Sequence, residues 1–191
     1  EKALIYFGGN AENVVYNIDN FRTLFFDSTV YIVNYCGYGG SSGSPHEGGF
    51  YSDALFVYDY FMKQHSTLSV MGRSIGGAVA TYLASKRDIE KLILVTPFDS
   101  AVNVGKKLYR FFPMDLIVKE RLDSAGIASQ ITIDTLIIVA ANDRIIPYEN
   151  TKNLIDSFKH REVEVVRLRN VGHNTVHHHP DYKKVIASFM R

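Results

Sequence analysis

A serine, an aspartate and a histidine occur in three short loops, each shortly after a stretch that is apolar enough to form a buried strand. Ser74 lies in a Gly-Arg-Ser-Ile-Gly stretch, Asp143 in Asn-Asp-Arg, and His173 in Gly-His-Asn. A serine hydroxyl becomes a good nucleophile when a histidine takes its proton and an acid orients that histidine. The three residues therefore predict a catalytic triad that attacks an acyl group.

Glycine stands two residues before and two residues after Ser74, at positions 72 and 76. In a sharp turn between a strand and a helix, side chains at these two positions would collide with the strand and the helix. Such a turn exposes Ser74 Oγ at the helix N-terminus, where the N–H of Ile75 and the helix dipole favour developing negative charge. The same pattern also fits an ordinary tight turn, so the catalytic interpretation depends on Asp143 and His173.

Three other features offer alternative chemistry. Asp99 is the alternative acid, but Asp143 is favoured because its loop precedes a proline and a helix. The consecutive histidines 177–179 have no acidic or cysteine ligand at metal-binding spacing, so we interpret them as a loop before a helix. The glycine-rich loop 37–43 lacks the third glycine of a dinucleotide-binding pattern and is expected to form a turn. We therefore expect neither a metal nor an organic cofactor.

Short apolar stretches alternate with longer amphipathic ones along the chain. The stretches at 3–7, 30–34, 68–71, 91–95, 135–140 and 164–168 are apolar on both faces, as in buried parallel strands. Helical spacing occurs at 13–25, 52–64, 75–86, 150–158 and 182–190. This alternation predicts one α/β domain over residues 1–191, with a mostly parallel central sheet and helices on both faces. The loops of Ser74, Asp143 and His173 would then meet at the carboxyl ends of the strands.

Residues 99–133 interrupt this alternation. The segment is longer than an ordinary connection and rich in aromatic and other large apolar residues, which predicts either a lid or helices that cover the core. We expect it to overlie the nucleophile, with its aromatic residues either in the core or around an apolar pocket for an acyl group. The basic residues Lys106, Lys107 and Arg110 are interpreted as a solvated helix face.

The composition limits the classes of partner and compartment. With 21 basic and 20 acidic residues, the chain has no electrostatic footprint for nucleic acid. The single cysteine, Cys36, excludes an internal disulfide and allows a reducing compartment. No apolar run approaches the roughly 20 residues of a membrane-spanning helix, so the sequence favours a cytoplasmic location without fixing it.

The first residue is Glu1, and a strand-like segment follows almost at once. We therefore expect a further segment upstream of Glu1, which would hold either two more edge strands or a membrane anchor. Any membrane contact is expected through that segment alone.

Six motifs in order carry a resemblance to a known family. They lie at residues 5–13, 35–43, 72–77, 96–100, 142–147 and 172–174, from the stretch that contains Gly-Gly-Asn-Ala to Gly-His-Asn. With these motifs the chain resembles the α/β-hydrolase superfamily over nearly its whole length. It is most similar to small serine hydrolases akin to prolyl-oligopeptidase catalytic domains, in the branch that also contains depalmitoylases and lysophospholipases. The order serine, acid, histidine is also that of the superfamily.

The resemblance implies a role for each site residue. Ser74 would be the nucleophile, His173 the general base and then the general acid, and Asp143 the residue that orients it. The backbone N–H groups of Asn10 and Ile75 would form the oxyanion hole. The expected reaction is hydrolysis of a small-molecule carboxylic ester or thioester through an acyl-enzyme. The alternatives are a peptidase or amidase of the prolyl-oligopeptidase kind and a catalytically silent binding protein with this fold.

The chain departs from the family pattern at two positions. Gly8 stands where many relatives have histidine, which should change loop packing more than chemistry, because the oxyanion hole uses backbone donors. Cys36 stands in place of the usual arginine, a substitution for which we find no physical reason.

Overall fold

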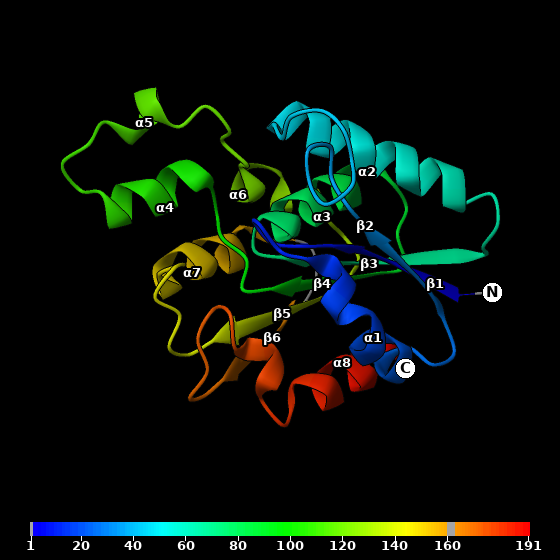
Figure 1. Ribbon diagram of the computed structural model, residues 1–191. Helices are drawn as coiled ribbons and strands as arrows, with labels where there is room; N and C mark the ends of the chain where they lie inside the picture. Colours follow the sequence, from blue (N-terminus) through cyan, green and yellow to red (C-terminus); the bar gives the residue numbers. More distant parts are fainter. Residues whose placement is uncertain (1, 160–162) are drawn as a thin grey trace.

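Six strands form one sheet in the computed structural model, which describes residues 2–159 and 163–191 (Figure 1). The strand order is β2-β1-β3-β4-β5-β6, and every neighbouring pair is parallel. The strands are β1 (Lys2–Phe7), β2 (Thr29–Val33), β3 (Thr67–Arg73), β4 (Lys91–Val95), β5 (Asp134–Ala140) and β6 (Val163–Leu168). This arrangement confirms the parallel α/β sheet that the apolar stretches predict.

Helices cover both faces of the sheet. One face carries α2 (Glu47–Phe61), α3 (Ile75–Lys86), α6 (Ser124–Ala128) and α7 (Tyr148–Ser157), and the other carries α1 (Ile18–Leu24) and α8 (Tyr182–Met190) (Figure 1). Short 3-10 helices, Val14–Asn17 and Val176–His178, precede α1 and α8. Among the described residues, no helix combines the length and the hydropathy needed to span a membrane.

Strand β1 shows how one sequence buries two faces. Ala3, Ile5 and Phe7 belong to the core under α2 and α3, whereas Leu4 and Tyr6 belong to the core under α1 and α8. All five side chains are at most 2% exposed. A strand that is covered on both faces has no polar face, and this explains why its sequence is a continuous apolar run.

The helices largely follow the predicted spacing, with differences at some of their starts and ends. Helices α3 and α8 have the predicted bounds, but α2 begins at Glu47 instead of residue 52. Gly48 and Gly49 in its first turn add nothing to the apolar pattern, and the ring of His46 fills the space beside Gly49. The predicted helix at 13–25 divides into a 3-10 turn and α1.

Residues 99–133 contain α4 (Ala101–Leu108), α5 (Met114–Ile117) and α6. Helix α6 packs against α3 and α7, and Leu122, Ala128 and Ile131 around it join the core. Helices α4 and α5 contact each other and extend away from the sheet (Figure 1). Helix α6 therefore covers the core, whereas α4 reaches the core with Ala101 and Val104 near its start.

We predict that the close approach of α3 to β1 depends on Gly76. A Cβ atom at this position would lie 2.1 Å from the carbonyl oxygen of Phe7, which is backbone and cannot move aside. Gly76→Ala should therefore lower the free energy of unfolding by about 2 kcal/mol or more, as measured by urea denaturation. Gly40→Ala is the matched control, because no atom lies within 4 Å of its new methyl group. Equal stability of the two variants would contradict the prediction.

Candidate active site

Ser74 occupies the sharp turn between β3 and α3. Its backbone has φ 54° and ψ −118°, in the left-handed half of conformational space that non-glycine residues rarely adopt. Its N–H donates to the carbonyl of Val95 at the end of β4, with N and O 2.9 Å apart. A Cβ at Gly72 would lie 2.1 Å from the carbonyl oxygen of Gly76. Glycine at 72 and 76 therefore permits the turn that presents Ser74, as the sequence pattern predicts.

His173 and Asp143 are in direct contact. Nδ1 of His173 lies 2.7 Å from Oδ2 of Asp143, and both side chains are less than a tenth exposed. A carboxylate can only accept, so Nδ1 carries the proton and Nε2 is the nitrogen that can take one. The other carboxylate oxygen, Oδ1, accepts from the backbone N–H groups of Ile145 and Ile146 at 2.9 and 2.8 Å. These bonds hold the carboxylate of Asp143 in place, and the carboxylate in turn orients the imidazole of His173.

Ser74 and His173 line the same pocket, which has a volume of about 190 Å³. The other residues that line it are Gly9, Asn10, Arg73, Ile145 and Asn174. The ends of β3, β5 and β6 thus bring Ser74, Asp143 and His173 together at the carboxyl edge of the sheet. None of the aromatic residues in the 99–133 segment lines this pocket.

The expected oxyanion donors lie at the same edge. Ile75 is the first residue of α3, where a backbone N–H has no acceptor within the helix. Asn10 lies in the loop after β1, and its side-chain oxygen accepts from the hydroxyl of Tyr38 at 2.6 Å. Tyr38 belongs to the glycine-rich loop, in which Gly37 and Gly39 have left-handed backbone. This loop therefore forms the expected turn and also supports the loop of Asn10.

Asp99 lies elsewhere. It is 1% exposed, and its carboxylate accepts from the amides of Asn103, Asn150 and Asn153 and from the N–H of Ser100. These bonds connect α4 to α7, and the acid in contact with His173 is Asp143. Within the described residues, no group of histidine, cysteine or acidic side chains could hold a metal ion. The histidines at 177–179 form the turn before α8.

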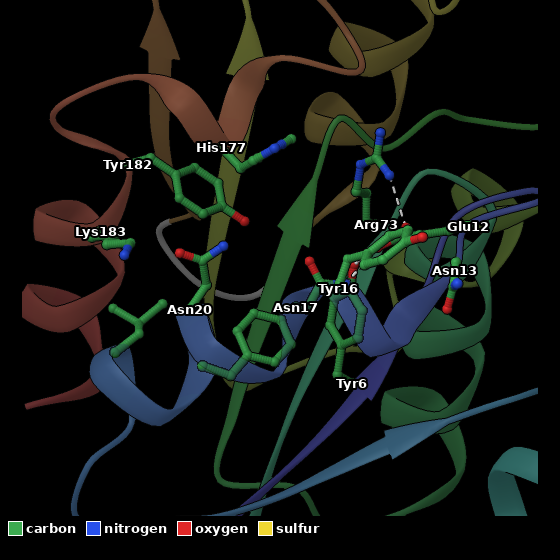
Figure 2. A pocket seen from close by; sticks show the side chains of 12 residues that line it. Tyr6, Glu12, Asn13, Tyr16, Asn17, Asn20, Arg73, His177, Tyr182 and Lys183 are labelled. Carbon is green, nitrogen blue, oxygen red and sulfur yellow. Dashed lines mark hydrogen bonds and ion pairs between the residues drawn. The ribbon is translucent and has the colours of Figure 1, made fainter.

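A buried ion pair between Glu12 and Arg73 lies behind the pocket and was not predicted from the sequence (Figure 2). Glu12 accepts four hydrogen bonds: from Arg73 Nη1 at 2.8 Å, Gly9 N at 2.6 Å, Tyr6 Oη at 2.8 Å and Asn17 Nδ2 at 2.7 Å. Burial raises the pKa of Glu12, but the bond from Gly9 and the charge of Arg73 outweigh it and hold that pKa below its ordinary value. Glu12 is therefore an ionised, fully paired carboxylate.

Arg73 extends this network to the histidine loop. Its Nη2 donates to the side-chain oxygen of Asn174 at 2.8 Å and to the carbonyl of His173 at 3.3 Å. One side chain thus connects the loop of Asn10, the turn of Ser74 and the loop of His173. The sequence did carry a signal for this role, because an arginine between a buried strand and a buried helix needs an acid partner.

A second hollow, of about 230 Å³, lies on the other side of this ion pair, between the α1 region and α8 (Figure 2). Tyr182 and Asn20 lie across it from Arg73 and Glu12 (Figure 2). Neither Ser74 nor His173 lines it. Ser74 and His173 therefore face the smaller pocket, and Arg73 is the residue that both hollows share.

Comparisons with known proteins show what the whole chain is similar to. A family model described as serine hydrolase (FSH1) matches residues 33–189. The uncharacterized membrane protein YNL320W of Saccharomyces cerevisiae is 30% identical over 195 residues, which cover 95% of this chain and 68% of that protein. Lysophosphatidylserine lipase ABHD12 of Danio rerio is 27% identical over 187 residues, or 83% of this chain and 49% of that protein. The chain spans about half the length of several curated relatives that it matches.

The solved structures show the fold. MGS-M2, an alpha/beta hydrolase enzyme from a Medee basin deep-sea metagenome library, superposes with a TM-score of 0.79 at 14% identity, covering 99% of this chain and 89% of that one. The parallel sheet and its flanking helices are thus an α/β-hydrolase fold, as the six sequence motifs indicate.

We predict that Glu12→Gln destabilises the protein in a pH-dependent manner. All four partners of Glu12 are donors, so the amide NH₂ of glutamine would face another donor, at a cost of about 2 kcal/mol. The pKa of Glu12 is lowered in the folded state. Its contribution to stability is therefore fully present at pH values above its ordinary pKa of 4.5. It is lost as pH falls through the lower folded pKa. Urea denaturation at several pH values should show the two proteins converging in stability below pH 4.5.

The matched control is Asp59→Asn, which breaks the exposed pair between Asp59 and Arg87. An exposed pair of this kind contributes about 0.5 kcal/mol, so this variant should remain close to wild type. A Glu12→Gln variant as stable as Asp59→Asn at pH 7 would show that the buried pair does not hold the loops together.

Proposed function

Because the chain belongs to the FSH1 family of serine hydrolases, we propose that it cleaves a small-molecule carboxylic ester or thioester through an acyl-enzyme on Ser74. The observation that supports this proposal most directly is the arrangement at the carboxyl edge of the sheet. Ser74 has left-handed backbone and shares a pocket with His173, and Nδ1 of His173 lies 2.7 Å from Asp143.

In the first half-reaction, Ser74 Oγ would attack the acyl carbon as its proton passes to Nε2 of His173. The carbonyl oxygen gains negative charge, which the N–H groups of Asn10 and Ile75 would stabilise. The bond to the leaving oxygen or sulfur then breaks, and His173 returns the proton to that group. Asp143 would keep the imidazole in the required tautomer throughout.

In the second half-reaction, water would attack the acyl carbon and lose a proton to His173. The bond to Ser74 Oγ breaks, and the serine recovers its proton as the free acid leaves. These steps use only protons and electron pairs that the three side chains, the substrate and one water molecule supply. The proposed reaction thus needs no metal or organic cofactor.

The substrate class follows from the relatives and from the pocket. ABHD12 of Danio rerio is named a lysophosphatidylserine lipase, and lysophospholipids are esters of fatty acids. The pocket beside Ser74 is small and lined by polar groups of Asn10, Arg73 and Asn174 as well as by the side chain of Ile145. These features favour an ester whose leaving group is polar. An amidase would use the same triad, and the choice between them is made by experiment.

We predict that a fluorophosphonate probe labels the protein at Ser74. Ser74→Ala should abolish labelling, and Asp143→Asn should slow it by a factor of about 10³–10⁴ because the wrong tautomer of His173 is favoured. Ser85→Ala, at the other end of α3, is the control and should react like wild type. Gel fluorescence against time measures the rates. Unchanged labelling of Ser74→Ala would contradict the proposal. A wild-type protein that the probe does not label would favour a catalytically silent binding protein.

A further prediction of the proposed function concerns the bond that is cleaved. Oxygen esters and thioesters with acyl chains from acetyl to palmitoyl should be hydrolysed, whereas the matching anilides should not, since amides need stronger leaving-group activation. Release of the chromophore, measured as kcat/KM for each substrate, gives the preferred chain length. Faster cleavage of the anilides would assign the protein to the peptidases and amidases instead.

A further inference from the structure

A group of large apolar side chains lies exposed on the segment from residue 106 to 121, here called the arm. The exposed apolar side chains of the arm are Leu108, Tyr109, Phe111, Phe112, Leu116 and Ile117. Phe111 is 95% exposed and Leu116 is 86% exposed. The arm contains the end of α4 and all of α5, which extend beyond the carboxyl ends of the strands (Figure 1).

The packing of the arm uses other residues than these six. Val102, Gly105 and Met114 are the buried residues of α4 and α5, and Met114 lies directly over Gly105. The buried contact between α4 and α5 is thus made by residues other than these six, which are at least 46% exposed. So many large apolar residues within ten positions are typical of a surface that binds a partner.

The charges of the arm indicate what kind of partner it would bind. Residues 106–121 contain five basic and two acidic side chains, a net charge of +3 in a chain whose total is +1. Lys106 pairs with Asp115, and Lys107 pairs with Glu149 of α7. A hollow of about 690 Å³ beside α4 is lined by Lys106, Lys107 and Arg110 and by three asparagines, with no acidic residue among its lining. The arm thus combines apolar side chains with a basic hollow.

We propose that the arm docks on the surface of an anionic phospholipid membrane. Phe111, Phe112 and Leu116 would enter the boundary between headgroups and acyl chains, while the basic hollow takes the phosphates of the headgroups. Aromatic and aliphatic side chains flanked by lysine and arginine are the combination that binds such an interface. Each basic residue near an anionic leaflet adds to the attraction.

Other occupants fit the arm less well. A second copy of the chain in a two-fold contact would place one arm with a net charge of +3 against another, which is repulsive. A nucleic acid backbone would satisfy the basic residues but would leave six large apolar side chains in water. An anionic bilayer offers both an apolar layer and negative charge.

The position of the arm connects this docking to the edge of the sheet that carries Ser74. The arm follows β4, and the carbonyl of Val95 at the end of β4 accepts a hydrogen bond from the N–H of Ser74. The pair between Lys107 and Glu149 connects the arm to the start of α7, a few residues after Ile145, which lines the pocket of Ser74. A docked arm would therefore keep this edge near the lipid surface. The arm would thus provide a membrane contact within the described part of the chain.

The test is sedimentation with lipid vesicles, carried out on Ser74→Ala so that lipid hydrolysis cannot interfere. Binding is expected to vesicles of phosphatidylcholine with about 30% phosphatidylserine, and to weaken at least about fivefold without phosphatidylserine or in high salt. Phe111→Asp and Arg110→Glu should each weaken it about tenfold, because one removes apolar burial and the other reverses a charge. Phe26→Asp is the matched control, because Phe26 is 86% exposed but lies outside the arm.

Several outcomes would overturn the proposal. They are failure to sediment with the anionic vesicles, equal binding by Phe111→Asp and Phe26→Asp, and a concentration-dependent dimer that only Phe111→Asp abolishes. Circular dichroism shows whether each variant is folded. If Phe111→Asp does not fold, vesicle binding by Arg110→Glu still tests the proposal. The assay needs no catalysis, so its result is separate from that of the fluorophosphonate labelling, which tests the proposed reaction alone.

Discussion

The ion pair between Glu12 and Arg73 is the interaction on which the candidate site most depends. Three loops that are far apart in the sequence meet at this pair: the loop of Asn10, the turn of Ser74 and the loop of His173. Both side chains are at most 16% exposed, so neither charge would be stable there without the other. The four donors around Glu12 lower its pKa relative to an isolated buried carboxylate and keep it ionised near neutral pH. The pair therefore holds the three loops together behind Ser74 and His173.

The parallel sheet supplies the second constraint. Because all six strands run in the same direction, their carboxyl ends share one edge, and the loops after β1, β3, β5 and β6 all reach it. The helix that follows Ser74 can start at that edge because Gly76 lets its backbone touch β1. The same edge gives rise to the arm, which leaves the sheet after β4. The proposed chemistry and the proposed membrane contact thus have one structural origin.

The sequence predicted the strands and the bounds of α3 and α8 because their apolar periodicity is long and uninterrupted. It also predicted which residues would meet at the carboxyl edge, since Ser74, Asp143 and His173 each lie in a distinctive loop motif. It missed the pairing of Glu12 with Arg73, which are 61 positions apart and which no local pattern connects. It also predicted that the aromatic residues between α4 and α5 belong to the core or line a pocket, because composition alone does not distinguish an exposed apolar side chain from a buried one. Their exposure depends on how far α4 and α5 stand from the sheet.

The proposed reaction depends on a covalent intermediate at Ser74, and intact-protein mass spectrometry measures that intermediate directly. Wild-type protein mixed with a p-nitrophenyl ester and quenched in acid within the burst should gain the mass of one acyl group. Peptide mapping should place that group on the peptide that contains Ser74, and a chain with Ser74→Ala should gain nothing. A burst of p-nitrophenol with no acyl group on the protein, or an acyl group on another residue, would contradict the account.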